Sequence, residues 1–316
     1  MKILTYDEVD HDQALLIHLS GFGWALTEEH VKAMVEHDAR IWKPFGIYAV
    51  DKGRVLGQIV PFRIPTRTRD GVEDVLGVAE VVTAPGEAQK GIATFLMRRV
   101  EEMGVEEGMR TSWLMTGRHL VAHHLYDKMG YFSVSSFPRG MKRLRRTGAK
   151  PRGVKISDFR KADQRRLSEL YREHVAGGYG FTERQWNFLD FPLAAHVFAK
   201  DSIKVARRGK EIIGYSIIRG GPGMLSLVEV VAPKLSDFRA IVRSMESRRK
   251  GALALAGSLI WERQREKFRS LGYKISPVHW YRLMAKPLRK GFSRRQIEHA
   301  YGIDDGRFVF MALDGF

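Results

Sequence analysis

The sequence predicts an α/β protein built from two tandem domains, each with a mixed, twisted sheet flanked by helices. Strand-like and helix-like segments alternate along the chain, and this mixed order favours a sheet with helices on its faces. At 316 residues the chain is longer than one typical domain. Its second half also repeats short features of its first half in the same order, which predicts a duplicated plan.

The first domain is predicted from hydrophobic periodicity and turn residues. An apolar strand, 78–83, is ended by Pro85 and Gly86, and apolar residues at helical spacing follow from Ile92 to Met103. Gly130 is placed to end a short helix. The expected strands lie near 2–5, 46–51, 54–63, 75–84 and 111–116, and the expected helices near 10–20, 27–38, 91–107 and 122–130.

The second domain and the tail are predicted in the same way. The expected strands lie near 196–200, 202–207, 211–219 and 224–232, and the expected helices near 158–176, 182–189, 236–249 and 260–270. A short helix near 294–301 and an apolar strand, 307–312, follow. The aromatic residues of this tail would be costly to leave in water, so we expect the tail to dock onto a domain.

Three short matches connect the two halves. Residues 52–60 are echoed by 208–217, 80–85 by 229–233, and 126–131 by 268–273. Each match alone can arise by chance, because hairpin turns and helix ends are common, but their shared order favours duplication. The predicted limits are 1–145 for the first domain, 146–153 for a basic linker, 154–289 for the second domain and 290–316 for the tail.

The loop between the 78–83 strand and the next helix is suited to binding a phosphate group. The first turn of a helix presents free backbone N–H groups at the positive end of the helix dipole. Gly91 leaves that turn open, and Lys90 adds a positive charge. The alternative is an ordinary strand-to-helix turn, since one glycine-bearing loop is weak support for a site. The loop is not a Walker loop, because Ile92 and Ala93 replace its Lys and Ser/Thr.

With its continuation, this region resembles the GNAT superfamily of acyl-CoA N-acyltransferases. The chain supplies the loop pattern Gly91-Ile92-Ala93 and the later helix-end pattern 126–131, Tyr-Asp-Lys-Met-Gly-Tyr. One departure is that Ala88 stands where the family has Arg or Gln, although Gln89 and Lys90 adjoin it. The resemblance implies two tandem acyl-CoA N-acyltransferase-like domains and acetyl-CoA or another acyl-CoA as co-substrate. It assigns the carrier to Val82, Thr83, Gln89, Lys90, Gly91, Ile92, Ala93 and Thr94.

Direct attack of an amine on a thioester requires a base for the amine and an acid for the departing thiolate. The resemblance makes Tyr126 the candidate acid, and the alternative is a half-buried aromatic at a helix end. Glu80 is our candidate base, because a carboxylate among apolar neighbours needs either a partner or a raised pKa. A structural salt bridge is the competing explanation. Phe22 and Trp24, just before the N-cap candidate Thr27, lie where the superfamily commonly builds its acceptor pocket, although core packing also explains them.

The second domain is expected to be a degenerate copy. Its loop after Pro233 lacks glycine, and Phe268, which cannot donate a proton, matches Tyr126. The charge also differs, because residues 1–140 hold 16 Lys and Arg against 19 Asp and Glu, whereas the remainder holds 37 against 17. The basic run 142–155 indicates either a solvated linker or contact with a polyanion such as nucleic acid, an acidic protein surface or an anionic substrate.

Other classes are disfavoured by composition. The absence of Cys excludes disulfides, thiolate metal sites and a Cys nucleophile. No apolar run reaches the length of a membrane span and no signal-type segment opens the chain, so we expect a cytoplasmic protein. His119, His123 and His124 lack a recognisable metal pattern, and no metal is predicted.

Three functions therefore stay open. The first is an N-acyltransferase, most simply an acetyltransferase acting on a primary amine. The second is a tandem transferase of another acyl or aminoacyl group, in which the carboxylate of Phe316 joins the active site and the basic half holds tRNA. The third is a non-catalytic basic module that uses this scaffold to bind nucleic acid or an acidic partner. The acceptor amine and the oligomeric state are not indicated by the sequence.

Overall fold

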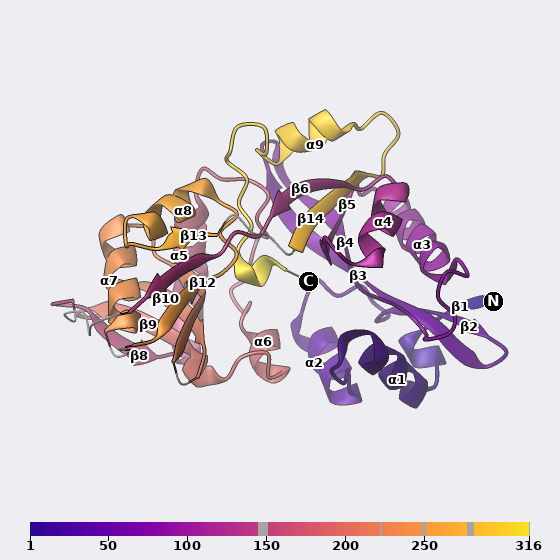
Figure 1. The fold of residues 1–316 in the computed structure, drawn as a ribbon, viewed down its shortest axis with the longest axis horizontal. Coiled ribbons are helices and arrows are strands. Elements are labelled where there is room, and N and C mark those ends of the chain that lie inside the picture. The colour runs from indigo at the N-terminus through magenta and orange to yellow at the C-terminus, as the bar shows by residue number, and fades with distance from the viewer. Residues whose placement is uncertain (145–150, 222, 248, 250, 277–280, 316) are drawn as a thin grey trace.

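The computed structural model describes residues 1–144, 151–221, 223–247, 249, 251–276 and 281–315, which form two sheets side by side (Figure 1). The first part of the chain holds β1 (Lys2–Thr5), α1 (His11–Phe22), α2 (Glu28–His37), β2 (Ile47–Asp51), β3 (Arg54–Thr68), β4 (Gly71–Thr83), α3 (Ile92–Glu106), β5 (Thr111–Gly117), α4 (Val121–Lys128), β6 (Phe132–Ser136) and β7 (Gly140–Arg143). The second part holds β8 (Lys155–Asp158), α5 (Gln164–Val175), α6 (Asp190–Ala194), β9 (Ile203–Arg208), β10 (Glu211–Arg219), β11 (Met224–Val231), α7 (Leu235–Glu246), β12 (Leu253–Ala256), α8 (Glu262–Arg269), β13 (Lys274–Ile275), β14 (Tyr281–Pro287) and α9 (Arg294–Ala300).

The two sheets have the same strand order. The first runs β1-β2-β3-β4-β5-β14-β6, and the second, read from its outer edge, runs β8-β9-β10-β11-β12-β7-β13. In each sheet the described pairs are antiparallel except at one place, β4 with β5 and β11 with β12. This equivalence is what a duplicated supersecondary plan predicts, and it confirms the predicted class of mixed sheets flanked by helices.

Two strands are exchanged between the halves. β14 lies between β5 and β6 of the first sheet, and β7 occupies the equivalent place beside β12 of the second sheet. Lys142 and Arg143 are therefore strand residues and not part of a linker, and Lys142 Nζ donates to Glu246 at 2.8 Å. The rest of the predicted basic run between 145 and 150 lies outside the described residues. The predicted domain limits therefore do not match the sheets, because β7 lies before residue 145 but belongs to the second sheet, and β14 lies after residue 154 but belongs to the first.

Helices cover both faces of the first sheet. α1 and α2 lie on one face, and α3 and α4 lie on the other (Figure 1). α3 is amphipathic, with Ile92, Leu96, Met97 and Val100 buried at helical spacing. Gly57 of β3 lies under this helix, where a Cβ would come within 2.6 Å of Ile92 Cγ2, so the sequence needs glycine there for the helix to pack closely.

Several predicted elements of the second half differ. Residues 182–189 form no helix and 196–200 form no strand; α6 begins only at Asp190, and the strand at 203. Residues 307–312 also form no strand, apart from one bridge between Tyr179 and Phe308. They do dock, because Phe308 and Phe310 pack into the first domain's core while Val309 and Met311 pack into the second domain's core. Contacts with two distant cores decide how this segment runs, so the local periodicity of residues 307–312 could not predict their backbone conformation.

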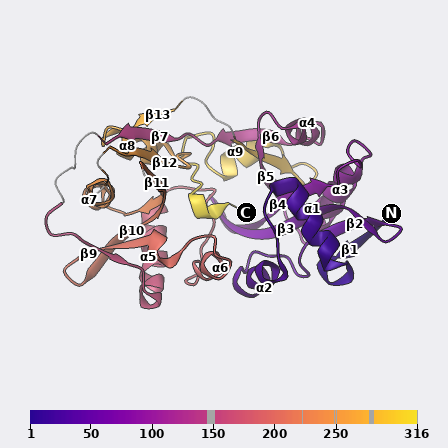
Figure 2. The same cartoon turned by 60° about the horizontal axis from the view of Figure 1, so that its bottom comes forward.

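The end of the described chain lies between the two sheets. Its short 3₁₀ turn, η4 (Ala312–Asp314), sits there in both views (Figures 1 and 2), and α2 packs against α6 nearby. Within the described residues, no helix combines the length and apolarity that crossing a bilayer requires.

Candidate active site

A gap opens between β4 and β5. These parallel strands are paired only from Leu76–Ser112 to Val78–Leu114, although β4 continues to Thr83 and β5 to Gly117. Val82 and Thr83 keep their pairing with β3 on the opposite edge, at Gln58 and Gly57. The β5-facing edge of this part of β4 therefore offers backbone donors and acceptors to an extended ligand.

The loop at the end of β4 has the backbone that a phosphate cradle needs. Gly86, Gln89 and Gly91 are all left-handed, with φ of 81°, 64° and 83°, and Gly91 is the N-cap of α3. A Cβ on Gly91 would meet no atom within 4 Å, so the space in front of the helix is open. The first turn of α3 carries no acidic residue, which leaves its positive end uncompensated.

The predicted carrier-binding side chains contribute unequally. Ile92 is buried beneath the helix, so only its backbone faces the cradle, while Ala93 and Thr94 are half-buried. Lys90 is exposed and forms an ion pair with Glu87 at 2.8 Å. Its charge is thus shared with a carboxylate, and the cradle depends mainly on the backbone N–H groups.

Tyr126 of α4 is buried against β4, β5 and α3, where its ring lies 5.9 Å from that of Tyr131. Burial raises its pKa to about 12. No hydrogen bond joins its hydroxyl to the residues that the structure describes. The phenol therefore stays protonated near neutral pH and keeps its donor free.

Glu80 lies at a bulge in β4, just past the last β4–β5 pair. The register with β3 shifts between Gln58 and Val60, and Glu80 has a φ of 52°, a conformation that side-chain-bearing residues seldom adopt. Its carboxyl faces the α1 side of the sheet, and burial raises its pKa to about 7. A carboxyl group with this pKa can gain or lose a proton near neutral pH.

The neighbours of Glu80 are polar but uncharged. His18 Nε2 lies 3.7 Å from Glu80 Oε2, and burial lowers the pKa of His18 to about 4. His18 is therefore neutral wherever Glu80 is ionised, so this contact is not an ion pair. Gln58 Nε2 lies 2.7 Å from His18 Nδ1, and with the amide oriented in this way the remaining imidazole N–H points towards Glu80. No Lys or Arg among the described residues pairs with Glu80.

Glu80 lines a cavity of about 540 Å³ between the two domains. Residues from both sheets, from the connection between β6 and β7, and from the tail form its walls. They are Phe22, Val78, Ala79, Glu80, Met115, Phe137, Arg139, Ser226, Val228, Leu255, Ala256, Gly257, Ser258, Tyr281, Phe310, Ala312 and Gly315. This volume is within the range of roughly 300–1,000 Å³ of small-molecule sites.

The two aromatic residues predicted near the acceptor are separated by the structure. Phe22 lines the cavity, whereas Trp24 is exposed and is not among the lining residues, and its ring lies edge-on to His18 at 4.3 Å between centroids. Thr27 caps α2 as predicted, since its side chain accepts a hydrogen bond from His30 N. Trp24 thus contacts the histidine that lies beside Glu80 and not the cavity itself.

The equivalent place in the second domain is filled. Glu229, like Glu80, lies two residues before a valine paired with the neighbouring strand, but it is itself paired with Ile217 and its carboxylate accepts bonds of 2.6 and 2.9 Å from Arg184. Arg184 also donates to Asp314 of the tail, and Leu313 N donates to Glu229 Oε2 at 3.2 Å. β11 is paired with β12 only as far as Leu227–Ala256, and beyond that point Trp261 and the tail residues Val309 and Met311 share a core with Val231. That the second copy is degenerate in function stays a prediction.

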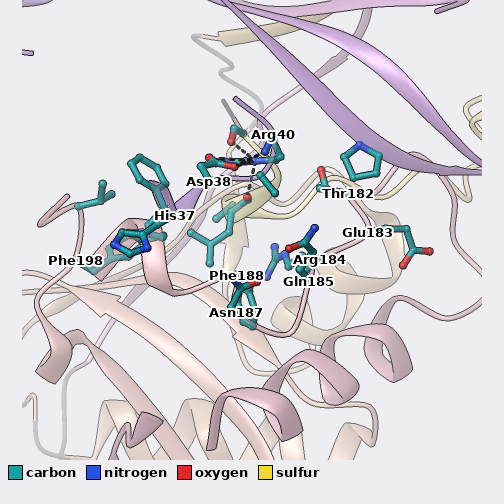
Figure 3. Close-up of a pocket in the computed structure, with 18 of the residues that line it drawn as sticks. His37, Asp38, Arg40, Thr182, Glu183, Arg184, Gln185, Asn187, Phe188 and Phe198 are labelled. Atoms are coloured by element: carbon teal, nitrogen blue, oxygen red, sulfur yellow. Dashed lines mark hydrogen bonds and ion pairs between the residues drawn. The ribbon is translucent and has the colours of Figure 1, made fainter. Parts of the chain in front are cut away.

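A second cavity, of about 340 Å³, lies on the other side of the tail (Figure 3). In this view Arg40 extends from beside Asp38 towards the tail, where it donates to the carbonyl of Gly315 at 3.0 Å. Val228, Ala312 and Gly315 line both cavities. The tail is therefore the partition between them. Phe316, whose carboxylate one sequence-based hypothesis placed in the active site, lies outside the described residues.

A polar cluster of α4 has the donor set of a metal site. The ligand atoms of His123, His124 and Asp127 lie within 4.8 Å of one another, and His123 pairs with Asp127 at 3.0 Å. The cluster is largely exposed, and the ion pair accounts for its closest contact without a metal.

Sequence reasoning missed His18, Gln58, Arg139 and Ser258. His18 shares α1 with His11, and no spacing in that helix singles it out, while the other three depend on register or on the meeting of two domains. The only local signal is the polar Gln58 inside the apolar run of β3.

Residues 13–131 match the model of the Acetyltransferase (GNAT) family. No protein with a curated description matches the chain in sequence. A solved structure from Enterococcus faecalis, described as a conserved protein of unknown function and probable N-acyltransferase, has a TM-score of 0.72 at 13% identity, over 91% of this chain and 72% of its own.

Two further solved structures are similar. A GCN5-related N-acetyltransferase from Anabaena variabilis has a TM-score of 0.71 at 15% identity, over 91% of this chain and 73% of its own. One from Sphaerobacter thermophilus has a TM-score of 0.54 at 13% identity, over 92% and 96%. At these identities the likeness shows the fold, and it extends across both domains.

Proposed function

We propose that this acyl-CoA N-acyltransferase moves an acetyl group from acetyl-CoA to a primary amine by direct attack. The match of residues 13–131 to the model of the Acetyltransferase (GNAT) family supports the proposal. The observation that carries the proposal is the gap between β4 and β5. It has the open cradle at Gly91 at one end and the carboxyl group of Glu80 beside the interdomain cavity at the other.

The residues present fit the carrier. The pyrophosphate would lie on the first-turn N–H groups of α3, where Gly91 leaves the approach open. The unpaired edge of β4 at Val82 and Thr83 would bind the extended arm of the carrier. Bound acetyl-CoA supplies a thioester, whose carbonyl carbon is the electrophile.

Glu80 acts on the acceptor. An amine attacks only in its neutral form, and a carboxylate of pKa about 7 can take the proton released as the C–N bond forms. His18, held by Gln58, can turn its N–H towards the ionised carboxylate and orient it. A backbone N–H of the bulged β4 segment can donate to the oxygen that becomes negative, since that edge is unpaired.

Tyr126 acts on the thiolate as the C–S bond breaks. An ordinary thiol has a pKa of about 8.5, so full transfer of the Tyr126 proton would be uphill by about 5 kcal/mol. Tyr126 therefore stabilises the thiolate by donating a hydrogen bond, and the final proton comes from water.

Calorimetric titration with acetyl-CoA and CoA tests the binding site. The wild type is compared with Gly91→Glu, which places a carboxylate in the cradle, and with Gly108→Glu, which has a similar φ of 76° and open surroundings at the far end of α3. We expect binding to be lost only in Gly91→Glu. Release of CoA thiol on addition of amines then tests catalysis, and wild-type protein that binds neither ligand would contradict the proposal.

A second candidate, the binding of a polyanion, is favoured by charge alone. The residues after 140 carry 20 more basic than acidic side chains, from 37 against 17. A transferase of another acyl or aminoacyl group would use the same fold, and its basic second half would bind the nucleic acid. Affinity for RNA that falls steeply between 50 and 200 mM salt would support it, and the absence of any such binding would dismiss it.

A further inference from the structure

The cavity beside Glu80 has an unusual division of charge. Among its described lining residues, Glu80 and Arg139 are the charged side chains. Most of the others are apolar, namely Phe22, Val78, Ala79, Met115, Phe137, Val228, Leu255, Ala256, Phe310 and Ala312. A cavity with this lining favours an apolar ligand body and offers one place for a cationic or amine group and another for an anionic group.

Arg139 is exposed, its backbone is held by hydrogen bonds, and its guanidinium has no partner among the residues that the structure describes. It lies between β6 and β7, where the chain passes from one sheet to the other. Its carbonyl accepts a bond from Ser276 N at 2.8 Å, and the carbonyl of Pro138 accepts one from Leu259 N at 3.0 Å. Within the described part of the chain no carboxylate or carbonyl accepts from the Arg139 guanidinium.

Other arginines near the cavities are already engaged. Arg184 is bound to Glu229 and Asp314, and Arg40 to Asp38 and the carbonyl of Gly315. A guanidinium with its planar fork unoccupied, next to a cavity, is suited to a carboxylate or another planar oxyanion, which it can bind through two parallel hydrogen bonds.

The opposite wall shows local backbone strain. Ser258, just after β12, has a φ of 52°, as Glu80 does at the bulge of β4. Both residues line this cavity, and non-glycine residues in this conformation gather at sites where the surrounding structure fixes a functional side chain. Ser226 and Ser258 add hydroxyl groups from the second domain. The second copy therefore supplies part of the cavity wall.

We propose that the acceptor is a compact apolar amine that carries a carboxylate, as an aromatic or aliphatic amino acid does. Its amine would lie beside Glu80, its carboxylate on Arg139 and its apolar body against Phe22, Phe137 and Phe310. This inference rests on the proposed acyl transfer and specifies its substrate class. The same lining disfavours polyamines, whose further positive charges would meet Arg139 and apolar walls.

The test compares amines that differ by one group. Rates of acetyl-CoA-dependent CoA release are measured with phenylalanine, with 2-phenylethylamine, which lacks the carboxylate, and with spermidine. Arg139→Gln removes the charge, and Arg143→Gln on β7, which is exposed and outside the cavity, is the matched control. A charge-assisted hydrogen bond of about 1.5–3 kcal/mol predicts a loss of about 10- to 150-fold in kcat/KM for phenylalanine in Arg139→Gln. For 2-phenylethylamine we expect a change of less than about twofold.

The outcomes separate this inference from the proposed function. Equal rates for phenylalanine and 2-phenylethylamine, unaffected by Arg139→Gln, would overturn the inference and leave acyl transfer intact. Acetyl-CoA that fails to bind would overturn the proposed function. Titration with the product N-acetylphenylalanine gives a readout independent of turnover: affinity that is lost in Arg139→Gln and kept in Arg143→Gln supports the site, and no affinity in the wild type contradicts it.

Discussion

Glu80 and Glu229 occupy equivalent positions in the two sheets, two residues before the valines that pair with Gln58 and Tyr215. Glu229 is fully enclosed and bound by Arg184, whereas Glu80 faces a cavity and its nearest basic group is the neutral imidazole of His18, 3.7 Å away. The same place in the two copies thus holds a structural ion pair, Glu229 with Arg184, and a titratable carboxyl group, that of Glu80. This difference separates the supporting copy from the candidate catalytic copy.

Glu80→Gln should remove the pH dependence of catalysis. In the wild type we expect kcat/KM to rise with pH through an apparent pKa of about 7, as Glu80 ionises. Loss of the base should lower the rate about 10²- to 10⁴-fold above pH 7 and flatten that limb. The pH–rate profile measured from pH 5.5 to 9 decides this, and a limb of unchanged midpoint in the variant would show that another group titrates.

The same variant should be more stable than the wild type at high pH. The pKa of Glu80 is raised in the folded state, so the folded protein holds this proton where the unfolded chain has lost it, and stability falls as pH rises from about 4.5 to 7. The shift corresponds to about 3 kcal/mol, and the uncharged amide avoids that cost. Urea unfolding at pH 5 and pH 8.5 should show a gain for Glu80→Gln only at the higher pH. An equal effect at both pH values would mean that Glu80 is not desolvated.

Tyr126→Phe should lower kcat and leave acetyl-CoA binding unchanged. The hydroxyl has no bond to a described residue, so its removal leaves no partner unsatisfied in the free protein. Loss of one donor to a developing negative charge costs about 10²- to 10³-fold in rate. Stopped-flow or steady-state CoA release, with the dissociation constant measured by calorimetry, separates the two effects. Weaker acetyl-CoA binding with an unchanged kcat would assign Tyr126 a packing role.

The sequence predicted those parts of the site that depend on local pattern. Gly91 and the helix that follows are recognisable because a left-handed N-cap needs glycine and the apolar period is clear from Ile92 onwards. The Thr27 cap was predicted for the same kind of reason. Glu80 could be singled out because a carboxyl group inside an apolar strand needs an explanation, and only the structure shows that no described Lys or Arg pairs with it.

The exchange of β7 and β14 could not be predicted. Each strand pairs with a sheet built from distant residues, β14 with β5 and β7 with β12, and no local pattern records such a register. Arg139 and Ser258 face one cavity only because this exchange brings the two domains together. The tail shows the same limit, because its apolar residues predict docking but not the path between two cores.

Gly91→Ala should weaken acetyl-CoA binding more than it destabilises the fold. A Cβ at a φ of 83° strains the backbone by about 1 kcal/mol and moves the first-turn N–H groups that form the cradle. Gly108→Ala, at a φ of 76° and also with open surroundings, should cost similar stability without affecting binding. Thermal unfolding and calorimetric titration of both variants provide the comparison. If the two variants bind acetyl-CoA equally well, the start of α3 is not the place where the pyrophosphate binds.

Arg184→Met should destabilise the protein strongly and in a pH-dependent way. Arg184 is buried with Glu229 and Asp314, and its removal leaves two enclosed carboxylates without a counter-charge, which costs about 3–5 kcal/mol. The loss should be smaller at pH 5 than at pH 8, because the uncompensated carboxyl groups can take up protons. Adding Glu229→Gln should restore part of the stability, since one buried charge is then gone.

Arg40→Met, which also releases the tail but lies nearer the surface, should cost about 1 kcal/mol. Urea unfolding of the four proteins at both pH values tests this order, and an Arg184→Met loss no larger than that of Arg40→Met would show that the buried cluster does not fix the tail.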